Sequence, residues 1–242
     1  MTPQYQTVFF PNFVKKMKAM TAVQLEKQLE VVPHLPKLLQ RMHRLLDNEQ
    51  AKRQEFREWL TEDHKAEFIN GRIIMHSPAA DEHNEAVLNL GSTANFYVSL
   101  KKLGKVRVEK AMIALTRNDY EPDVAFWKTE KAATIKSEHN VYPAPDLIVE
   151  VLSKSSVKRD RVTKFEDYAA HGVTEYWIVD PNKKTVEQYF LPSEDSTIYA
   201  LKKKATLDDT LESEVIEGFL LPVRAIFDAA ANAELLANLF ET

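Results

Sequence analysis

The sequence predicts an α/β protein: a mixed β-sheet flanked by helices, preceded by an N-terminal helical extension. Between residues 68 and 190, short runs rich in apolar and β-branched residues alternate with amphipathic segments of helical period. Before residue 61, apolar residues recur at helical spacing. With 242 residues, 44% of them hydrophobic, the chain is long enough to enclose a sizeable core.

In the N-terminal extension, residues 1 to about 20 show no clear period, and we expect a loosely ordered lead. Thr21 is a candidate cap for a helix that continues to Val32, where prolines at 33 and 36 interrupt it. A third, charged helix is expected at about 49–60. The helix between them carries an apolar stripe formed by Leu35, Leu38, Leu39, Met42, Leu45 and Leu46. This stripe must be buried, either against the same chain or against a second copy.

A β-hairpin is predicted at residues 68–75, because Asn70-Gly71, a strong two-residue turn signal, separates two strand-like runs. After Ser77-Pro78 we expect a long amphipathic helix, which Gly104 ends. The remaining elements expected are strands at about 106–116, 122–127, 146–152, 175–179 and 185–190, and a helix at about 160–171.

Two of these strands carry an acid beside apolar residues. Asp123 precedes the run Val124–Trp127, and Glu150 lies within Leu147–Leu152, a nearly all-apolar run that we expect at the centre of its sheet. Burying an unpaired carboxylate is costly, so such an acid normally meets a metal, a basic side chain or several hydrogen bonds. Asp123 and Glu150 are therefore the first candidates for chemistry. The alternative is that they are paired acids at strand ends.

The absence of cysteine excludes disulfides, thiol nucleophiles and cysteine-based zinc sites, so any metal must be held by oxygen or imidazole. No apolar run approaches the roughly 20 residues needed to cross a bilayer, and the N-terminus lacks the charged-then-apolar order of a signal peptide. We therefore expect a cytoplasmic protein without a membrane partner.

The net charge is −4, but basic residues gather in two stretches near the candidate acids. Residues 101–110 and residues 154–164 each contain five basic residues against one acid. Such stretches suit phosphate binding, although they are also typical of a solvated face.

Several blocks of the sequence together carry a family resemblance. They are Glu67–Arg72, Ser77-Pro78 followed by His83, Pro122-Asp123-Val124, Pro145–Ser153, Asp160-Arg161 with Lys164 and Tyr168, and Gly172–Pro181. In this order they resemble the Uma-two family of candidate endonucleases, part of the restriction-endonuclease-like, PD-(D/E)XK superfamily. The resemblance covers about residues 55–225. It implies a restriction-endonuclease-like domain at 55–242, with residues 1–54 as the helical extension.

The resemblance also implies a metal-dependent endonuclease that hydrolyses phosphodiester bonds in DNA. In this superfamily, an Asp on one strand and an acid on the next hold a divalent cation that activates water, while a Lys stabilises charge or orients that water. Asp123 and Glu150 match the two acids, and Mg²⁺ or Mn²⁺ suits their oxygen ligands. Leu152 stands where the motif has its Lys. The resemblance points instead to Lys164 on the following helix, which otherwise is an exposed lysine or a partner of Asp160.

Glu67, ahead of the hairpin, and His83, near the start of the long helix, are further site candidates, because carboxylate and imidazole can each add a ligand or a base beside a metal. The alternatives are a surface charge for Glu67 and a capping or packing role for His83. Tyr168, one helical turn beyond Lys164, is expected either to line the cleft or to belong to the core.

Two other functional classes stay open. The principal alternative is a non-catalytic nucleic-acid-binding or assembly protein on the same fold. A hydrolase acting on another phosphate ester is less favoured, because the sequence contains no Gly-x-x-x-x-Gly-Lys loop. For the endonuclease we expect DNA as partner and a homodimer, since two sites cleave both strands of a duplex most simply and the apolar stripe needs a cover.

Overall fold

A computed structural model of the chain describes residues 22–61, 63–136, 140–193 and 195–240. The predicted lead at 1–20 and the cap at Thr21 lie outside these residues. The chain divides into two compact units, residues 1–52 and 53–242. No helix in the described ranges is long and apolar enough to span a bilayer.

The first unit contains α2 (Ala22–Glu30) and most of α3 (Leu35–Trp59), whose last turns belong to the second unit. The prediction of separate helices at 35–46 and 49–60 was wrong. The intervening residues are polar but include neither Pro nor Gly, so nothing ends the helix there. Pro36 lies in the first turn of α3, where its missing N–H costs nothing. Four residues of the apolar stripe are exposed, namely Leu39, Met42, Leu45 and Leu46.

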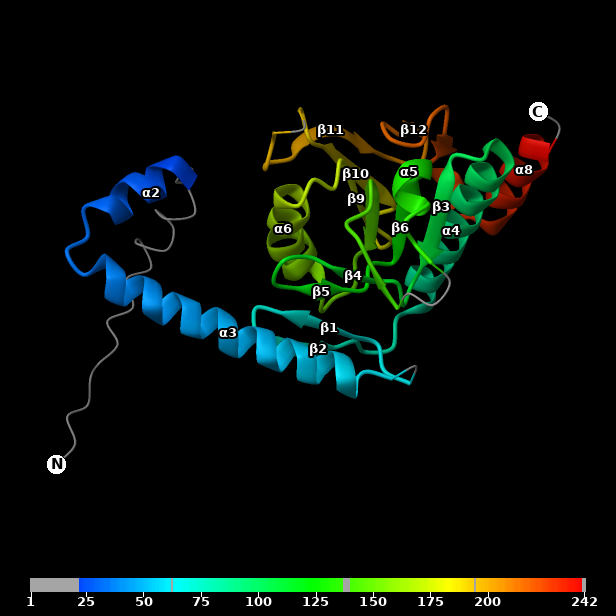
Figure 1. Ribbon diagram of the computed structural model, residues 1–242. Helices are drawn as coiled ribbons and strands as arrows, with labels where there is room; N and C mark the ends of the chain where they lie inside the picture. Colours follow the sequence, from blue (N-terminus) through cyan, green and yellow to red (C-terminus); the bar gives the residue numbers. More distant parts are fainter. Residues whose placement is uncertain (1–21, 62, 137–139, 194, 241–242) are drawn as a thin grey trace. The chain divides into compact units, whose positions relative to one another are not determined.

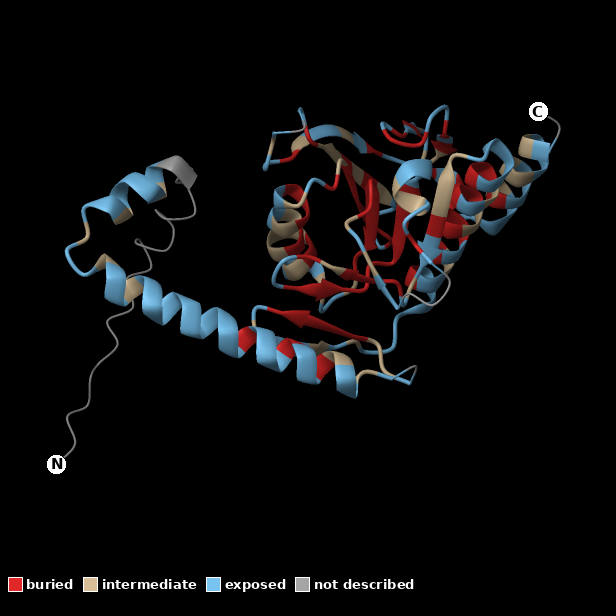
Figure 2. Ribbon diagram, viewed as in Figure 1, coloured by how far each residue is buried: buried red, intermediate tan, exposed pale blue. Residues whose placement is uncertain are grey.

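A six-stranded mixed sheet forms the centre of the second unit as described (Figure 1). Its strand order is β11-β10-β9-β8-β6-β3, and only β8 and β9 run parallel to each other. The strands are β3 (Gly104–Val108), β6 (Val124–Lys128), β8 (Leu147–Val151), β9 (Glu175–Asp180), β10 (Thr185–Phe190) and β11 (Ala200–Ala205). The middle of this sheet is buried on both faces (Figure 2), so β8 is the internal strand that its apolar composition predicts.

A second sheet has the order β2-β1-β5-β4-β7, and its members are β1 (Ala66–Ile69), β2 (Arg72–Met75), β4 (Met112–Ala114), β5 (Asp119–Tyr120) and β7 (Val141–Tyr142). The predicted hairpin is confirmed: Asn70 and Gly71 join β1 to β2, and both have positive φ, as a tight hairpin turn requires. A further pair, β12 (Thr210–Glu212) with β13 (Leu220–Pro222), follows near the C-terminus.

The single strand predicted at 106–116 is instead divided between the two sheets. β3 ends at Val108, and β4 starts at Met112 in the other sheet. The chain changes direction at Glu109, whose φ of 53° is uncommon for a residue with a side chain. The helix before β3 also ends earlier than predicted, because Lys102 rather than Gly104 adopts the left-handed cap conformation.

Helices cover both faces of the six-stranded sheet. On one face α4 (Asp81–Lys101), α7 (Arg224–Phe227) and α8 (Ala229–Phe240) enclose a core with Val124 and Phe126 of β6. On the other face, Ala125 and Trp127 share a core with α6 (Phe165–Ala170), which continues a π-helical turn, η1 (Arg159–Lys164). A short helix, α5 (Thr129–Ala132), follows β6. Neighbouring side chains of β6 point to opposite faces of the sheet, because side chains alternate along a strand with a period of two residues.

Candidate functional site

Pairing of β6 with β8 brings the two acids of the sequence analysis together. The strands are antiparallel, and Val124 pairs with Val149. Asp123 precedes Val124 and Glu150 follows Val149, so these two acids lie opposite each other. Alternation along β8 places Glu150 on the same face as Ile148, which packs in the core on the α6 side. Both acids are buried, and both line one cleft of about 950 Å³. The start of α4, the end of β2 and the loop after β8 form other parts of its wall.

Lys164 enters this cleft from η1. Its Nζ donates to Glu150 Oε1 at 2.8 Å, lies 2.8 Å from Glu67 Oε1 and is 3.6 Å from Asp160 Oδ1. The side chain is 2% exposed, which rules out the alternative of an exposed helix lysine. The pairing with Asp160 exists, but it is the longest of three contacts. The hydroxyl of Tyr168 also donates to Glu150 Oε1, at 2.9 Å, so Tyr168 is buried beside the site.

The Lys164 ammonium thus contacts three carboxylates, and the pKa values of two of them, Glu67 and Glu150, shift in opposite directions. Burial lowers the pKa of Lys164, but the charges of Glu150, Glu67 and Asp160 outweigh this effect and raise it well above its usual range. Burial raises the pKa of Glu67, yet the charge of Lys164 and the contact with His76 bring it down to about 2. Burial raises the pKa of Glu150 well above normal, and Lys164 offsets this only in part. Glu150 is therefore a buried acid that a further nearby cation would help to ionise.

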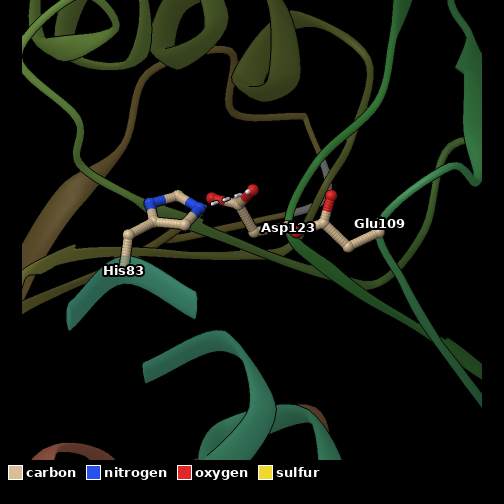
Figure 3. A group of neighbouring side chains, drawn as sticks. All are labelled: His83, Glu109 and Asp123. Atoms are coloured by element: carbon tan, nitrogen blue, oxygen red, sulfur yellow. Dashed lines mark ion pairs between the residues drawn. The ribbon is translucent and has the colours of Figure 1, made fainter. Parts of the chain in front are cut away.

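A second group of side chains lies around Asp123. His83, Glu109 and Asp123 each offer a ligand atom, and these atoms all lie within 4.8 Å of one another (Figure 3). His83 projects from the first turn of α4, and its Nε2 is 3.5 Å from Asp123 Oδ1. Its Nδ1 is buried and has no hydrogen-bond partner among the described residues. Asp123 Oδ2 accepts the backbone N–H of Val151 at 2.7 Å, which fixes the carboxylate between the two strands.

The pattern of a family described as "Uma2: Putative restriction endonuclease" matches residues 53–224. The chain belongs to the Uma2 family. This confirms the family predicted from the sequence blocks. A crystal structure of a putative nuclease belonging to DUF820, from Anabaena variabilis ATCC 29413, covers 76% of this chain and 97% of its own, with 18% identity and a TM-score of 0.61. That likeness shows a shared fold.

The type IIG restriction endonuclease BpuSI is also similar, over 69% of this chain and 18% of its own, with 11% identity and a TM-score of 0.35. No curated protein matches the chain significantly.

Of the residues that the sequence analysis of this Uma2 protein proposed, Asp123, Glu150, Lys164 and His83 line the cleft directly. Glu67 lies behind them on β1. It is fully buried, in contact with Lys164 and 3.3 Å from His76 Nε2.

Two residues that were not predicted from the sequence, Lys65 and Glu109, form an ion pair at the cleft. Lys65 Nζ also lies 3.6 Å from Asp123 Oδ1. Glu109 is the one acid in the basic stretch at residues 101–110, and this exception was the sequence signal that could have marked it as a site candidate.

The basic stretch at 154–164 is not a single solvated face. Lys164 is buried in the site, Arg161 pairs with Glu187 at 2.6 Å, and Arg159 comes within 4.0 Å of Glu67. Lys154 and Lys158 are exposed, and Lys154 lines the cleft. The stretch therefore contributes both to the interior of the site of this Uma2 protein and to its solvent-facing rim.

Proposed function

We propose that this Uma2 protein is a metal-dependent endonuclease that hydrolyses DNA phosphodiester bonds, with Asp123 and Glu150 as ligands of one Mg²⁺ or Mn²⁺. The observation that carries the proposal is the arrangement of Asp123 opposite Glu150 in one cleft, with the Lys164 ammonium 2.8 Å from Glu150. The family description supports the reaction class.

The residues present fit a hard divalent cation. Mg²⁺ and Mn²⁺ prefer carboxylate oxygens, and the single Lys164 ammonium contacts three buried carboxylates, those of Glu150, Glu67 and Asp160. Burial raises the pKa of the Glu150 carboxyl well above its usual range, and the charge of Lys164 offsets this only in part. When bound, such an ion lowers the pKa of a coordinated water and neutralises charge on a phosphate. His83 is a candidate third ligand or base, since one ring nitrogen lies close to Asp123 and the other has no hydrogen-bond partner in the part of the chain that the structure describes.

The chain's own residues then have distinct roles. Lys164 stabilises negative charge next to Glu150 and so replaces the lysine of the superfamily motif. The motif position itself is occupied by Leu152, which packs in the core. Glu67 holds the Lys164 ammonium from the opposite side. Tyr168 is a positioning residue, because its hydroxyl orients the Glu150 carboxylate. Exposed lysines such as Lys154 and Lys158 are suited to contact DNA phosphates. A cytoplasmic location, as the sequence predicts, gives access to such a substrate.

Replacing Lys164 by Met is expected to reduce the cleavage rate at saturating DNA by about a hundredfold, because a fixed charge beside the reacting phosphate is lost. The DNA dissociation constant should change by no more than about threefold, since the buried ammonium is not a general phosphate contact. Single-turnover cleavage and fluorescence anisotropy measure the two effects. A thermal melt of the variant checks that the buried acids left behind have not unfolded it.

Lys158→Met is the matched control, because it removes an exposed lysine from the same stretch. It should weaken binding modestly and reduce the salt dependence by about one ion, with the rate unchanged. If Lys164→Met instead cuts within a few-fold of the parent, the catalytic assignment fails and the non-catalytic DNA-binding alternative gains support.

We also propose that the protein is a homodimer that uses the apolar stripe of α3. The positions 35, 38, 42 and 45 alternate in steps of three and four, which is the spacing of a coiled-coil seam. Leu39, Met42, Leu45 and Leu46 are between 41% and 57% exposed in the single chain, far more than core leucines. A second copy would cover this face in the same way on both chains.

Light scattering of the full chain at micromolar concentration should give twice the chain mass. The double variant Met42→Glu/Leu45→Glu should give the mass of one chain, because charges on the seam oppose pairing. Ile198→Glu, at another exposed apolar position, is the control and should leave the mass unchanged. A monomer mass for the unmodified chain rejects the dimer and favours packing of the stripe within its own chain.

A further inference from the structure

The side chain of Lys65, the residue before β1, reaches into the proposed metal site. Lys65 directly precedes β1, and its carbonyl accepts the N–H of His76 at 3.0 Å, so the hairpin fixes its backbone. Its side chain leaves the hairpin and enters the cleft, where Nζ pairs with Glu109 and lies 3.6 Å from Asp123 Oδ1. The ammonium therefore lies between two acids of the same ligand group.

Glu109 is held toward this point by an unusual backbone. Its φ of 53° occurs where the chain passes from β3 to β4, and its N–H donates to the carbonyl of Asp123 at 3.0 Å. A non-glycine residue in this conformation costs free energy, and such residues concentrate at functional sites. Two acids are thus fixed side by side, and like charges at this separation repel each other unless a cation lies between them.

We infer that Lys65 is a surrogate cation: its ammonium occupies the space between Glu109 and Asp123, and a divalent ion held by Asp123 and Glu150 has to compete with it for the Asp123 carboxylate. This inference rests on the proposed metal site and adds a residue that regulates its occupancy. Lys65 has both acids as partners at once, since its Nζ pairs with Glu109 and lies 3.6 Å from Asp123 Oδ1. The side chain is 24% exposed, which gives the ammonium a route into solvent without movement of the hairpin backbone.

If the Lys65–Glu109 salt bridge had a purely structural role, a different effect on metal affinity would be expected. If Lys65 only tied the hairpin to the β3–β4 corner, removing it would leave the affinity unchanged or would weaken it by loosening the ligands. If Lys65 competes with the metal, removing its charge must strengthen metal binding, because the ion no longer displaces an ammonium that the same carboxylates stabilise.

The test is a calorimetric titration of Mn²⁺ into the full chain without DNA. Lys65→Met should bind Mn²⁺ about tenfold more tightly than the parent, as expected for the loss of one competing charge within 4 Å of the ligands. Lys65→Gln, which keeps a polar end, should show the same direction. Lys65→Arg keeps the charge and should bind like the parent. Lys154→Met, which removes an exposed lysine of the same cleft, should change the affinity by less than about twofold.

Thermal melts give a second measurement. In EDTA, Lys65→Met should melt below the parent, because Glu109 and Asp123 lose their shared cation. Saturating Mn²⁺ should raise its melting temperature by more than it raises that of the parent.

The outcomes separate this inference from the metal site itself. If the parent binds Mn²⁺, Asp123→Asn abolishes the binding and Lys65→Met binds no more tightly, the surrogate cation is rejected and the metal site stands. If neither the parent nor Lys65→Met binds Mn²⁺, both proposals are rejected.

Discussion

Asp123→Asn and Glu150→Gln are each expected to reduce metal-dependent cleavage of DNA by about a thousandfold or more, equivalent to ~4 kcal/mol of transition-state stabilisation. Either change removes one of two carboxylate ligands, and an amide oxygen is a much weaker ligand for Mg²⁺ than a charged carboxylate. The amides retain acceptor oxygens for the groups that the acids bind, the N–H of Val151 and the ammonium of Lys164. The folded structure should therefore survive, and the loss should lie in metal binding and turnover.

The measurement is cleavage of a supercoiled plasmid in Mg²⁺ and in Mn²⁺, with a Mn²⁺ titration of each variant. Glu187→Gln is the control, because this acid pairs with Arg161 and is not among the residues that line the cleft. It should cut at the parental rate. If both site variants cut as fast as the parent, the activity arises from another site or from a contaminating nuclease.

Arg53→Met is expected to destabilise the protein by about 3–5 kcal/mol, the usual consequence of removing one partner from a buried ion pair. The Arg53 guanidinium makes two bonds to Asp119, at 2.6 and 2.9 Å, and also donates to the carbonyls of Leu115, Thr116 and Asn118. Asp119 is fully buried. Without Arg53, the basic partner that Asp119 retains among the described residues is Arg57, whose side chain is 28% exposed. Three carbonyls would also lose a donor.

Urea unfolding at neutral pH measures this effect. Lys52→Met, an exposed neighbour on the same helix, should change the free energy of unfolding by less than about 0.5 kcal/mol. The double variant Arg53→Met/Asp119→Leu should recover part of the loss, because no buried charge is then left unpaired. Equal stability of Arg53→Met and the parent would contradict a stabilising role for the Arg53–Asp119 ion pair.

The role of Arg53 also bears on the domain boundary. The boundary expected from the sequence lies between residues 54 and 55, and it stays a prediction. The family match and the second compact unit both begin at Arg53. We propose that the nuclease-like domain starts there, because a domain cut after residue 54 would lose Arg53, the more deeply buried of the two arginines that pair with Asp119. Phe56, in the same helix and 1% exposed, packs against Phe68 of β1 in a core cluster of that unit.

Local sequence patterns predicted much of the fold. The Asn70-Gly71 turn, the apolar run of β8 and the helical period of α4 each appear where expected, because each depends on neighbouring residues in the chain. The β3–β4 corner was missed. Residues 106–116 look like one strand, and only the pairing of their two halves in different sheets shows that the chain turns at Glu109.

For the site, blocks of the sequence by themselves identified the family. The sequence also proposed the acids Asp123 and Glu150, because a carboxylate among apolar strand residues needs a compensating partner wherever the chain folds. The family resemblance pointed to Lys164 as their basic partner, and only the tertiary structure showed its bond to Glu150 and the presence of Lys65 beside Asp123. Lys65 is 58 residues from Asp123 in the chain, and partly exposed charged residues such as Lys65 and Glu109 look like ordinary surface positions in a sequence. Burial and ion pairing depend on which distant segments pack together, and this is why Lys164, Lys65 and Arg53 acquire their partners only in the folded chain.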